Sequence, residues 1–394
     1  MRLAQRMAGI GTETAFEAAA RARALEAEGR DIIHLEIGEP DFDTPANIRA
    51  AAKKALDDGW THYGPALGLP VLREAIAEDA TARKGFRAEP ANVVVTPGAK
   101  PIMFFAILAL VEPGDEVIYP DPGFPIYESM TRYVGGVPVP INLREENDFR
   151  FDPAEVAAAT NERTKLIIFN SPHNPTGGVL TPADVEALAE IGRRHPNVTF
   201  LADEIYGRIV YDGEHVSIAA LPGMAERTIV LDGFSKTFAM TGWRLGYAIV
   251  PSWLVETYSK LIINSVSCTS SFSQVAAAEA LRGPQQSVDA MVEEFRTRRE
   301  LIVEGLNRIP GITCRMPHGA FYVFPNVAGT GISNNELADK LLYDGGVCVL
   351  SGSAFGQHCR DHVRISYANS QANLRRALER IEEVVAGLPA AAPA

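Results

Sequence analysis

The amino-acid sequence predicts an α/β protein with a large domain, built on a mostly parallel seven-stranded sheet between helices, and a smaller α+β domain. Short apolar runs alternate with segments of helical spacing through the middle of the chain, which is typical of a parallel sheet covered on both faces. The chain has 394 residues, of which 46% are hydrophobic, so it is long enough for a large core and for two domains.

The large domain is predicted to begin with two helices, at residues 45–57 and 69–83, which have helical spacing. The strands that follow are predicted at residues 92–96, 115–120, 136–141, 165–170, 198–202, 227–232 and 245–250. A helix through Ile102 and Ala109 follows the first of these strands.

Helices dominate the chain after residue 252. They are predicted at 252–264, 272–282, 285–308, 333–343 and 371–386, with short strands at 320–324, 347–350 and 363–367. The segment 285–308 is long enough to bridge two domains. These later elements predict the smaller α+β domain.

Composition excludes several classes of partner. The formal net charge of −12 argues against electrostatic binding to nucleic acid or to an anionic membrane. The first six residues lack the apolar core of a signal peptide. The longest apolar run, Ile102 to Val111, is too short to span a bilayer. We therefore expect a cytoplasmic protein that binds small molecules.

The four cysteines are widely spaced and form no metal-ligand pairs: Cys268, Cys314, Cys348 and Cys359. Reduced thiols are expected, and no metal is assigned.

The segment from Ser235 to Tyr247 carries the most informative chemistry. Lys236 offers an amine that becomes a nucleophile towards carbonyls when burial or nearby cations lower its pKa. Arg244, eight residues on, presents a planar fork suited to a phosphate, and glycines at 242 and 246 allow close backbone approach. This pairing suits an aldehyde cofactor with a phosphate, although a surface turn would give the same short motif.

Two further segments place polar groups where predicted strands end. Asn174 follows the apolar run Leu166 to Phe169, and Asp203 and Tyr206 follow the run Val198 to Ala202. Open α/β sheets bind ligands at the carboxyl ends of their strands. A carboxylate there can keep a pyridine nitrogen protonated, whereas the alternative role of Asp203 is a helix cap.

These motifs resemble the fold-type I, class I pyridoxal-phosphate aminotransferases of the aspartate aminotransferase kind, from about Ile33 to Arg376. The resemblance implies a large domain of residues 46–285 and a small domain of residues 1–45 and 286–394. It also implies pyridoxal 5′-phosphate as the cofactor. The implied reaction is a ping-pong transfer of an amino group, through aldimine and pyridoxamine forms, from an L-amino acid to a 2-oxo acid.

The resemblance assigns roles to individual residues. Lys236 corresponds to the Schiff-base lysine and proton shuttle, Asp203 to the partner of the ring nitrogen, and Tyr206 and Asn174 to partners of the ring oxygen. Arg244 corresponds to a phosphate ligand, and Phe124 to the aromatic residue stacked on the cofactor. Arg364 corresponds to the arginine that binds the substrate α-carboxylate, and Gly38 to the glycine whose backbone lines that carboxylate.

The phosphate site needs backbone donors as well. Thr96 to Lys100 joins a strand to a helix, and the amides at a helix start bind anions, so Gly98, Ala99 and Lys100 are assigned to the cofactor site. Tyr63 matches a tyrosine that reaches the phosphate in the neighbouring subunit, which implies a homodimer with shared active sites. Gly233 stands where many relatives have a phosphate-binding serine, which predicts weaker cofactor retention by about 0.5–1.5 kcal/mol or more.

Two residues bear on the choice of substrate. Lys100 matches a lysine that recognises the distal carboxylate of aspartate or glutamate in a bacterial subgroup, which favours acidic substrates slightly. Against this, the N-terminal segment has Ala15, Phe16 and Glu17 where that subgroup has small hydroxylated residues. Glu17 would favour a basic substrate such as arginine, and alanine and aromatic amino acids are further alternatives. Lys100 and Glu17 could also both face solvent and have no role in substrate choice.

The reaction class also has alternatives. A pyridoxal-phosphate β-lyase or an amino-acid oxidase on the same fold would share Lys236, Asp203 and Arg244. Formation of pyridoxamine phosphate distinguishes transamination from both.

Overall fold

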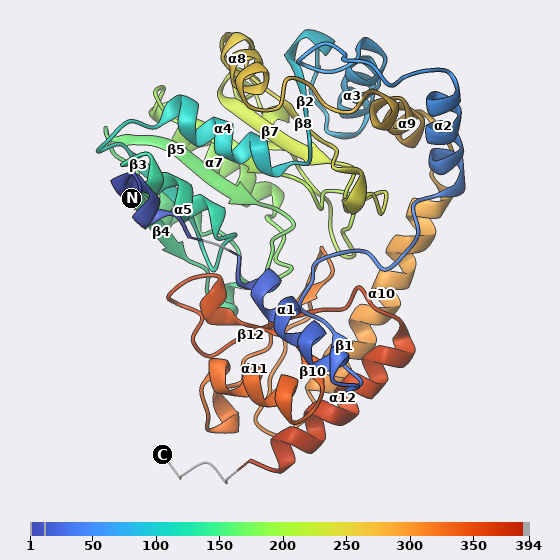
Figure 1. Cartoon of the computed structure of the whole chain (residues 1–394). Coiled ribbons are helices and arrows are strands. Elements are labelled where there is room, and N and C mark those ends of the chain that lie inside the picture. Colours follow the sequence, from blue (N-terminus) through green and yellow to red (C-terminus); the bar gives the residue numbers. More distant parts are fainter. Residues whose placement is uncertain (1, 12, 389–394) are drawn as a thin grey trace.

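The computed structural model describes residues 2–11 and 13–388, and its central element is a seven-stranded sheet (Figure 1). The strand order is β2-β8-β7-β6-β5-β3-β4. Strand β8 is antiparallel to both of its neighbours, and all other neighbouring pairs of this sheet are parallel. The predicted fold class, with a mostly parallel seven-stranded sheet, is confirmed.

Each strand of this sheet lies within one residue of its predicted bounds. The strands are β2 (Val93–Thr96), β3 (Glu116–Asp121), β4 (Val137–Asn142), β5 (Thr164–Asn170), β6 (Thr199–Asp203), β7 (Thr228–Gly233) and β8 (Gly246–Ile249).

Helices cover both faces of the sheet, as the apolar runs require. Along β5, Leu166 and Ile168 belong to the hydrophobic cluster that contains helix α4, whereas Ile167 and Phe169 belong to the cluster that contains α7. Successive side chains of a strand point to opposite faces, so an uninterrupted apolar strand buries both. These helices are α2 (Ala46–Asp57), α3 (Pro70–Arg83), α4 (Lys100–Leu110), α5 (Ile126–Tyr133), α6 (Pro153–Ala159), α7 (Pro182–Arg194), α8 (Val255–Ser265) and α9 (Ser271–Arg282).

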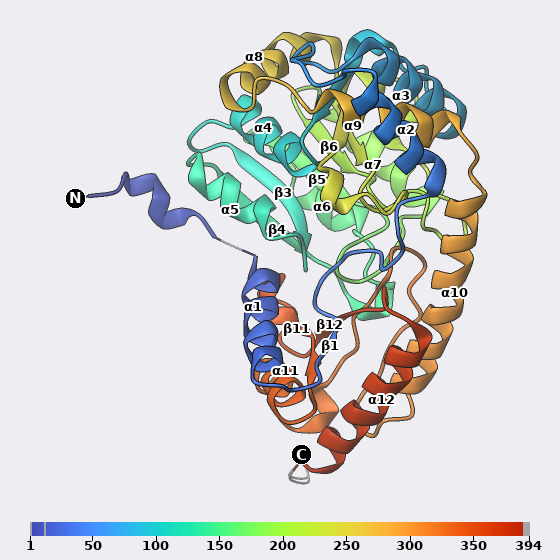
Figure 2. The same cartoon turned by 45° about the vertical axis from the view of Figure 1, so that its right-hand side comes forward.

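A smaller α+β part packs beneath the sheet (Figure 2). Strands β1 (Ile33–His34) and β10 (Val347–Cys348) form a parallel pair, and β11 (Leu350–Ser351), β12 (Val363–Ser366) and β9 (Tyr322–Val323) form an antiparallel sheet in that order. Helices α1 (Thr14–Ala27), α10 (Gln286–Leu306), α11 (Asn334–Tyr343) and α12 (Gln371–Ala386) complete it. Helix α10 runs from this part up to the region of α2 and α9 (Figure 2).

Short 3₁₀ helices connect these elements. They lie at Gln5–Gly9, Pro90–Asn92, Glu145–Asn147, Ile218–Ala220, Ala225–Arg227, Thr241–Trp243, Ser252–Leu254, Ala328–Thr330 and Gly352–Ala354.

One predicted element is wrong in detail. The strand predicted at 347–350 is two strands, because Val347 and Cys348 pair with β1, whereas Leu350 and Ser351 pair with β12. The chain changes sheets at residue 349, and both pieces are buried, so the apolar pattern shows no break. The division into residues 46–285 and 1–45 plus 286–394 stays a prediction, since one hydrophobic cluster includes residues from both sides, such as Leu35 and Leu201.

Candidate active site

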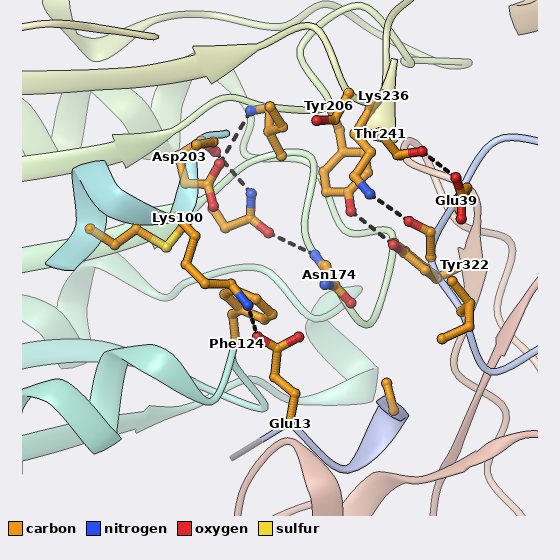
Figure 3. Close-up of a pocket in the computed structure, with 18 of the residues that line it drawn as sticks. Glu13, Glu39, Lys100, Phe124, Asn174, Asp203, Tyr206, Lys236, Thr241 and Tyr322 are labelled. Atoms are coloured by element: carbon orange, nitrogen blue, oxygen red, sulfur yellow. Dashed lines mark hydrogen bonds and ion pairs between the residues drawn. The ribbon is translucent and has the colours of Figure 1, made fainter. Parts of the chain in front are cut away.

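A cavity of about 540 Å³ lies where the sheet, the smaller part and the N-terminal segment meet (Figure 3). Its wall brings together ten of the predicted site residues: Gly38, Ala99, Lys100, Phe124, Asn174, Asp203, Tyr206, Lys236, Arg244 and Arg364. They come from segments as far apart as residues 38 and 364, so only the folded chain creates this constellation.

Parallel strands deliver the polar groups to one edge of the sheet. Asn170 at the end of β5 is in register with Asp203 at the end of β6, and Asp203 is in register with Leu231 of β7. The Asn170 amide donates to the Asp203 carbonyl oxygen over 2.9 Å and accepts from the Asn174 backbone N–H over 2.8 Å. These bonds fix the loop that carries Asn174 against the end of β6.

Lys236 follows β7 and directs its amine into the cavity. The Nζ atom donates to the carbonyl oxygen of Gly38 over 2.5 Å (Figure 3). Burial lowers the pKa of Lys236 to about 8; the positive charges of Arg364 and Arg244 contribute to this value, and the negative charge of Glu39 opposes it. An amine with this pKa is partly unprotonated near neutral pH, which is the form that attacks a carbonyl.

Asp203 is 4% exposed and faces the same cavity. Its carboxylate accepts from the Tyr127 hydroxyl over 3.1 Å and from the Ile205 backbone N–H over 3.2 Å. Burial and, to a smaller extent, the negative charges of Asp232 and Glu204 raise the pKa of Asp203 to about 7. A cation beside Asp203 would offset this cost of burying its charge.

Arg364 is the other buried charge on the wall. It is 4% exposed, and its Nη1 donates to Asn174 Oδ1 over 3.0 Å while Nη2 donates to the Glu36 carbonyl oxygen. Its guanidinium lies 4.6 Å from the Tyr322 ring centroid. The Nε atom is buried without a hydrogen-bond partner among the described residues, so one donor of this guanidinium is available to a ligand.

Tyr322, which the sequence analysis did not identify, contacts two predicted site residues, Tyr206 and Arg364. Its hydroxyl lies 2.8 Å from the Tyr206 hydroxyl, and the ring packs on Arg364. A Cβ atom at position 38 would lie 1.9 Å from the Tyr322 hydroxyl. Only glycine therefore fits at position 38. Packing against Tyr322 requires glycine there, in addition to the backbone role that the sequence analysis assigned to it.

The start of α4 forms the anion-binding side of the cavity. Among the described residues no side chain caps the first turn of this helix, so its N–H groups and the positive end of its dipole are available. Gly98 has φ of +85°, and a Cβ atom there would lie 2.3 Å from Arg244 Nη2. Arg244 is held by a 2.8 Å bond from Nη1 to the Thr241 carbonyl oxygen. Gly98 itself does not line the cavity, but its missing side chain makes room for Arg244.

The mouth of the cavity carries a charge pair that the sequence analysis did not predict. Lys100 binds the carboxylate of Glu13, and its Nζ lies 5.2 Å from the Phe124 ring centroid (Figure 3). Phe16 also lines the cavity and is 62% exposed. The sequence signal for Glu13 was weak because its contact with Lys100 spans 87 positions.

Besides Gly98, three residues given roles in the sequence analysis lie away from the wall. Glu17 is exposed on α1 and does not line the cavity, since the adjacent Phe16 and Ala15 face it instead. Tyr63 is 91% exposed. Gly233 is buried in β7, where a Cβ atom would lie 3.1 Å from Gly246 Cα.

The described part of the chain contains neither a metal-ligand cluster nor a membrane-spanning helix. Within residues 2–11 and 13–388, no group of three or more His, Cys, Asp or Glu side chains is arranged to hold a metal ion. No helix in that part of the chain combines the length and apolarity needed to cross a membrane.

The residues on the wall fit pyridoxal phosphate. Lys236 would supply an amine for the aldehyde, Asp203 a buried carboxylate for the ring nitrogen, and Arg244 with the start of α4 the donors for the phosphate. The Arg244 guanidinium, for which Gly98 leaves room, and the partnerless Arg364 Nε offer donors to bound anions.

Comparisons with known proteins agree with this chemistry. The family model for class I and II aminotransferases matches residues 30–381. The chain is 43% identical over 360 residues to the aspartate aminotransferase of Pyrococcus abyssi, covering 90% of this chain and 92% of that protein. It is also 43% identical over 380 residues to the aspartate/prephenate aminotransferase of Cereibacter sphaeroides, covering 93% and 94%.

The same likeness holds in three dimensions. The crystal structure of the aspartate aminotransferase from Rhizobium meliloti matches with a TM-score of 0.94 and 40% identity, covering 99% of this chain and 100% of that one. The buried lysine, carboxylate and arginine of the cavity thus lie within a fold and sequence shared with aminotransferases. The chain belongs to the class I and II aminotransferases and is a pyridoxal-phosphate-dependent transaminase.

Proposed function

We propose that this transaminase prefers dicarboxylic amino acids, aspartate and glutamate, with a 2-oxo acid as acceptor. The observation that carries this proposal is that Lys100 binds a carboxylate, that of Glu13, on the wall of the same cavity that contains Arg364. A substrate with two carboxylates can place one on Arg364 and the other on Lys100. Relatives named for aspartate support the same preference.

Arg364 is proposed to bind the α-carboxylate that every amino-acid substrate carries. Its planar guanidinium can form two parallel hydrogen bonds with a carboxylate. Nε is buried without a partner, and Nη1 is already oriented by Asn174. Gly38, whose carbonyl oxygen holds Lys236, lies beside this site and has no side chain to obstruct it.

Lys236 is proposed to be the base that removes the substrate Cα proton and later returns a proton during the transfer. Pyridoxal phosphate, when bound, supplies the electron sink that makes this proton acidic. A base with a pKa of about 8 is matched to proton transfer near neutral pH. Asp203 is proposed to pair with the ring nitrogen, and Tyr206 and Asn174 with the ring oxygen.

The phosphate is proposed to lie at the start of α4. Arg244 and the backbone N–H groups of Ala99 and Lys100 would hold it there, since a helix N-terminus favours anions. Phe124 lines the cavity and is proposed to stack on the ring. Glycine at position 233 is proposed to leave the phosphate with one donor fewer than in relatives that have a serine.

A homodimer in the cytoplasm is proposed as the working unit. Tyr63 is 91% exposed and outside the cavity, which suits a residue that completes a partner's phosphate site. A mixture of Tyr63→Ala and Lys236→Ala chains tests this, because a shared site predicts recovered activity in hybrid dimers and independent sites predict none. The free thiols of all four cysteines suit a reducing compartment.

A basic amino acid is the second candidate substrate, because Glu13 presents a carboxylate to the same cavity. A spectral titration of the cofactor-loaded protein with a panel of amino acids separates the candidates. Aspartate and glutamate are expected to convert the lysine-bound cofactor band to a pyridoxamine band at lower concentrations than arginine, alanine or phenylalanine. A lower half-saturating concentration for arginine would contradict the proposal, and no pyridoxamine with any amino acid would favour a lyase or an oxidase.

A further inference from the structure

A buried charge cluster lies on the face of the sheet opposite the cavity. Asp203 and Leu231 line the cavity. Because successive side chains of a strand point to opposite faces, Asp232, which follows Leu231 in β7, faces the other way. Glu204, the residue after the end of β6, lies with Asp232, since both contact the same Lys84 Nζ. Both are buried, with 1% and 8% exposure. Two carboxylates therefore lie directly behind Asp203.

Lys84 binds both of these carboxylates. It is the C-cap residue of α3, directly after Arg83, and is 8% exposed. Its Nζ lies 2.7 Å from Glu204 Oε2 and 2.8 Å from Asp232 Oδ2. A single ammonium thus joins the end of α3 to the ends of β6 and β7.

The two carboxylates differ in how much they depend on Lys84. Asp232 also accepts from the Gly233 backbone N–H over 2.7 Å and from the Tyr247 hydroxyl over 3.2 Å. Glu204 has no other aligned donor among the described residues: its Oε1 is buried without a partner, and the His215 Nε2 at 3.2 Å is not aligned for a hydrogen bond. If Lys84 is removed, Glu204 loses the one aligned hydrogen bond that it accepts from the described residues and keeps only the close approach of His215.

Of the other basic groups nearby, His215 has its Nε2 3.2 Å from Glu204 Oε2 and, together with Lys84, opposes the effect of burial on the pKa of Glu204, whereas two arginines are paired elsewhere. Arg83 forms an ion pair with Asp79, and Arg208 bonds to Gln285 and Asp289. Glu204 and Asp232 both act on Asp203, since their negative charges raise its pKa. The positive charge of Lys84 lies between these two carboxylates and opposes that effect.

We propose that Lys84 is a positioning residue for transamination, which offsets one of the two negative charges of Glu204 and Asp232 behind the sheet so that Asp203 can serve as an ionised partner of the cofactor ring nitrogen. This inference rests on the proposed role of Asp203. Without Lys84, the negative charges of Glu204 and Asp232 are not offset, and they lie on the Asp203 side of the pair that Asp203 forms with the ring nitrogen. The proton shared between Asp203 and the ring nitrogen then moves towards the carboxylate, and the nitrogen loses its positive charge.

The test is the resonance of an isotopically labelled ring nitrogen in the loaded protein, together with the rate of cofactor dissociation. Lys84→Met is expected to move the nitrogen resonance from its protonated towards its neutral position and to speed dissociation about tenfold, the ratio that corresponds to one pKa unit. A Lys84→Met protein that keeps the wild-type nitrogen resonance would overturn the inference.

A charge-balanced variant separates an electrostatic role from a purely structural one. Lys84→Met combined with Glu204→Gln removes one charge of each sign and leaves Asp232 with its two other donors. The nitrogen resonance is expected to return to the wild-type position. A double variant as perturbed as Lys84→Met would mean that packing alone, and not charge, accounts for the effect.

Two further variants keep the outcomes distinct. Lys84→Gln retains N–H donors without the charge, so it replaces Lys84→Met if that variant does not fold, and the same shift is expected. Asp203→Asn tests the underlying role: if it leaves the nitrogen resonance unchanged, the proposed pairing of Asp203 fails. If Asp203→Asn moves the resonance and the Lys84 variants do not, only the inference about Lys84 fails.

Discussion

The inner wall and the mouth of the cavity are built in different ways. Asp203 and Arg364 on the inner wall are each 4% exposed and are held by partners from several elements. At the mouth, Phe16 is 62% exposed, and Lys100, with a side chain 45% exposed, binds Glu13 and lies over the face of Phe124. Buried groups have strongly shifted pKa values and few alternative positions, whereas an exposed pair can exchange partners. The inner wall therefore suits the reaction common to the family, and the mouth suits the choice of substrate.

The largest effect is expected at Lys236, because the inner wall has no second amine placed to act as the base. Lys236→Ala should lower kcat by at least about 10²–10⁴-fold, the usual contribution of a positioned acid-base group. Steady-state kinetics and the absorbance spectrum of the loaded protein measure this. A variant that keeps both normal turnover and the lysine-bound cofactor band would refute the assignment. Lys260→Ala, on the exposed face of α8, is the control.

The free-energy cost of burying the ionised Asp203 carboxylate can be measured as a change in the stability of the protein. Its pKa is raised from 3.8 to about 7, so the carboxyl favours the folded apoprotein below pH 4, and this contribution is lost as pH rises to about 7. The loss corresponds to about 4 kcal/mol. Asp203→Asn lacks this titration and should be more stable than the wild-type apoprotein at pH 8, but not at pH 4, while it loses transaminase activity.

Chemical denaturation of both apoproteins at the two pH values provides the measurement. The difference between the two proteins matters, because other titrating groups contribute equally to each. If the free energy of unfolding of Asp203→Asn exceeds that of the wild type by the same amount at pH 4 and pH 8, Asp203 is not a buried acid with a raised pKa.

Arg364→Lys should affect every substrate to the same extent. Lysine keeps the positive charge but loses the planar fork, and a hydrogen bond to a charged group contributes about 1.5–3 kcal/mol. The value of kcat/KM should therefore fall by about 10–100-fold for aspartate and alanine alike. A loss confined to aspartate would place Arg364 at the distal rather than the α-carboxylate.

The contrast between wall and mouth also explains what the sequence could predict. Asn174 and Asp203 were found because each follows an apolar run, and parallel strands bring such ends to one edge. The whole seven-stranded sheet followed from the same alternation. Periodicity and strand ends are local signals, so they identify residues that the sheet itself positions.

Contacts between distant segments left no such signal. Tyr322 meets Tyr206 across 116 positions, and Glu13 meets Lys100 across 87. The sequence analysis reached the right segment at the N-terminus but selected Glu17, because which side of a helix faces a cavity depends on how the helix packs. The split of the strand at 347–350 was missed for a related reason: its two halves differ only in their pairing partners, Ile33 and Arg364 among them.

The smallest effects are expected at the mouth. Lys100→Ala should lower kcat/KM about tenfold for aspartate and glutamate, which corresponds to the loss of one charge-assisted contact of about 1.4 kcal/mol, and should leave alanine unchanged. Glu13→Gln is the matched change on the other side of the pair. Because Glu13 occupies Lys100 as a distal carboxylate would, its removal should lower KM for dicarboxylic substrates by up to about fivefold, within the range of an exposed ion pair.

The two variants together decide whether the pair selects the substrate. If Glu13 only competes for Lys100, Glu13→Gln in the Lys100→Ala background should have no effect on aspartate. If Glu13→Gln instead lowers kcat/KM for arginine and leaves aspartate unchanged, Glu13 binds a basic side chain directly, and the dicarboxylate preference is wrong. Kinetics of the two single variants and the double variant with aspartate, arginine and alanine distinguish these outcomes, because alanine reports only on the inner wall that all three substrates share.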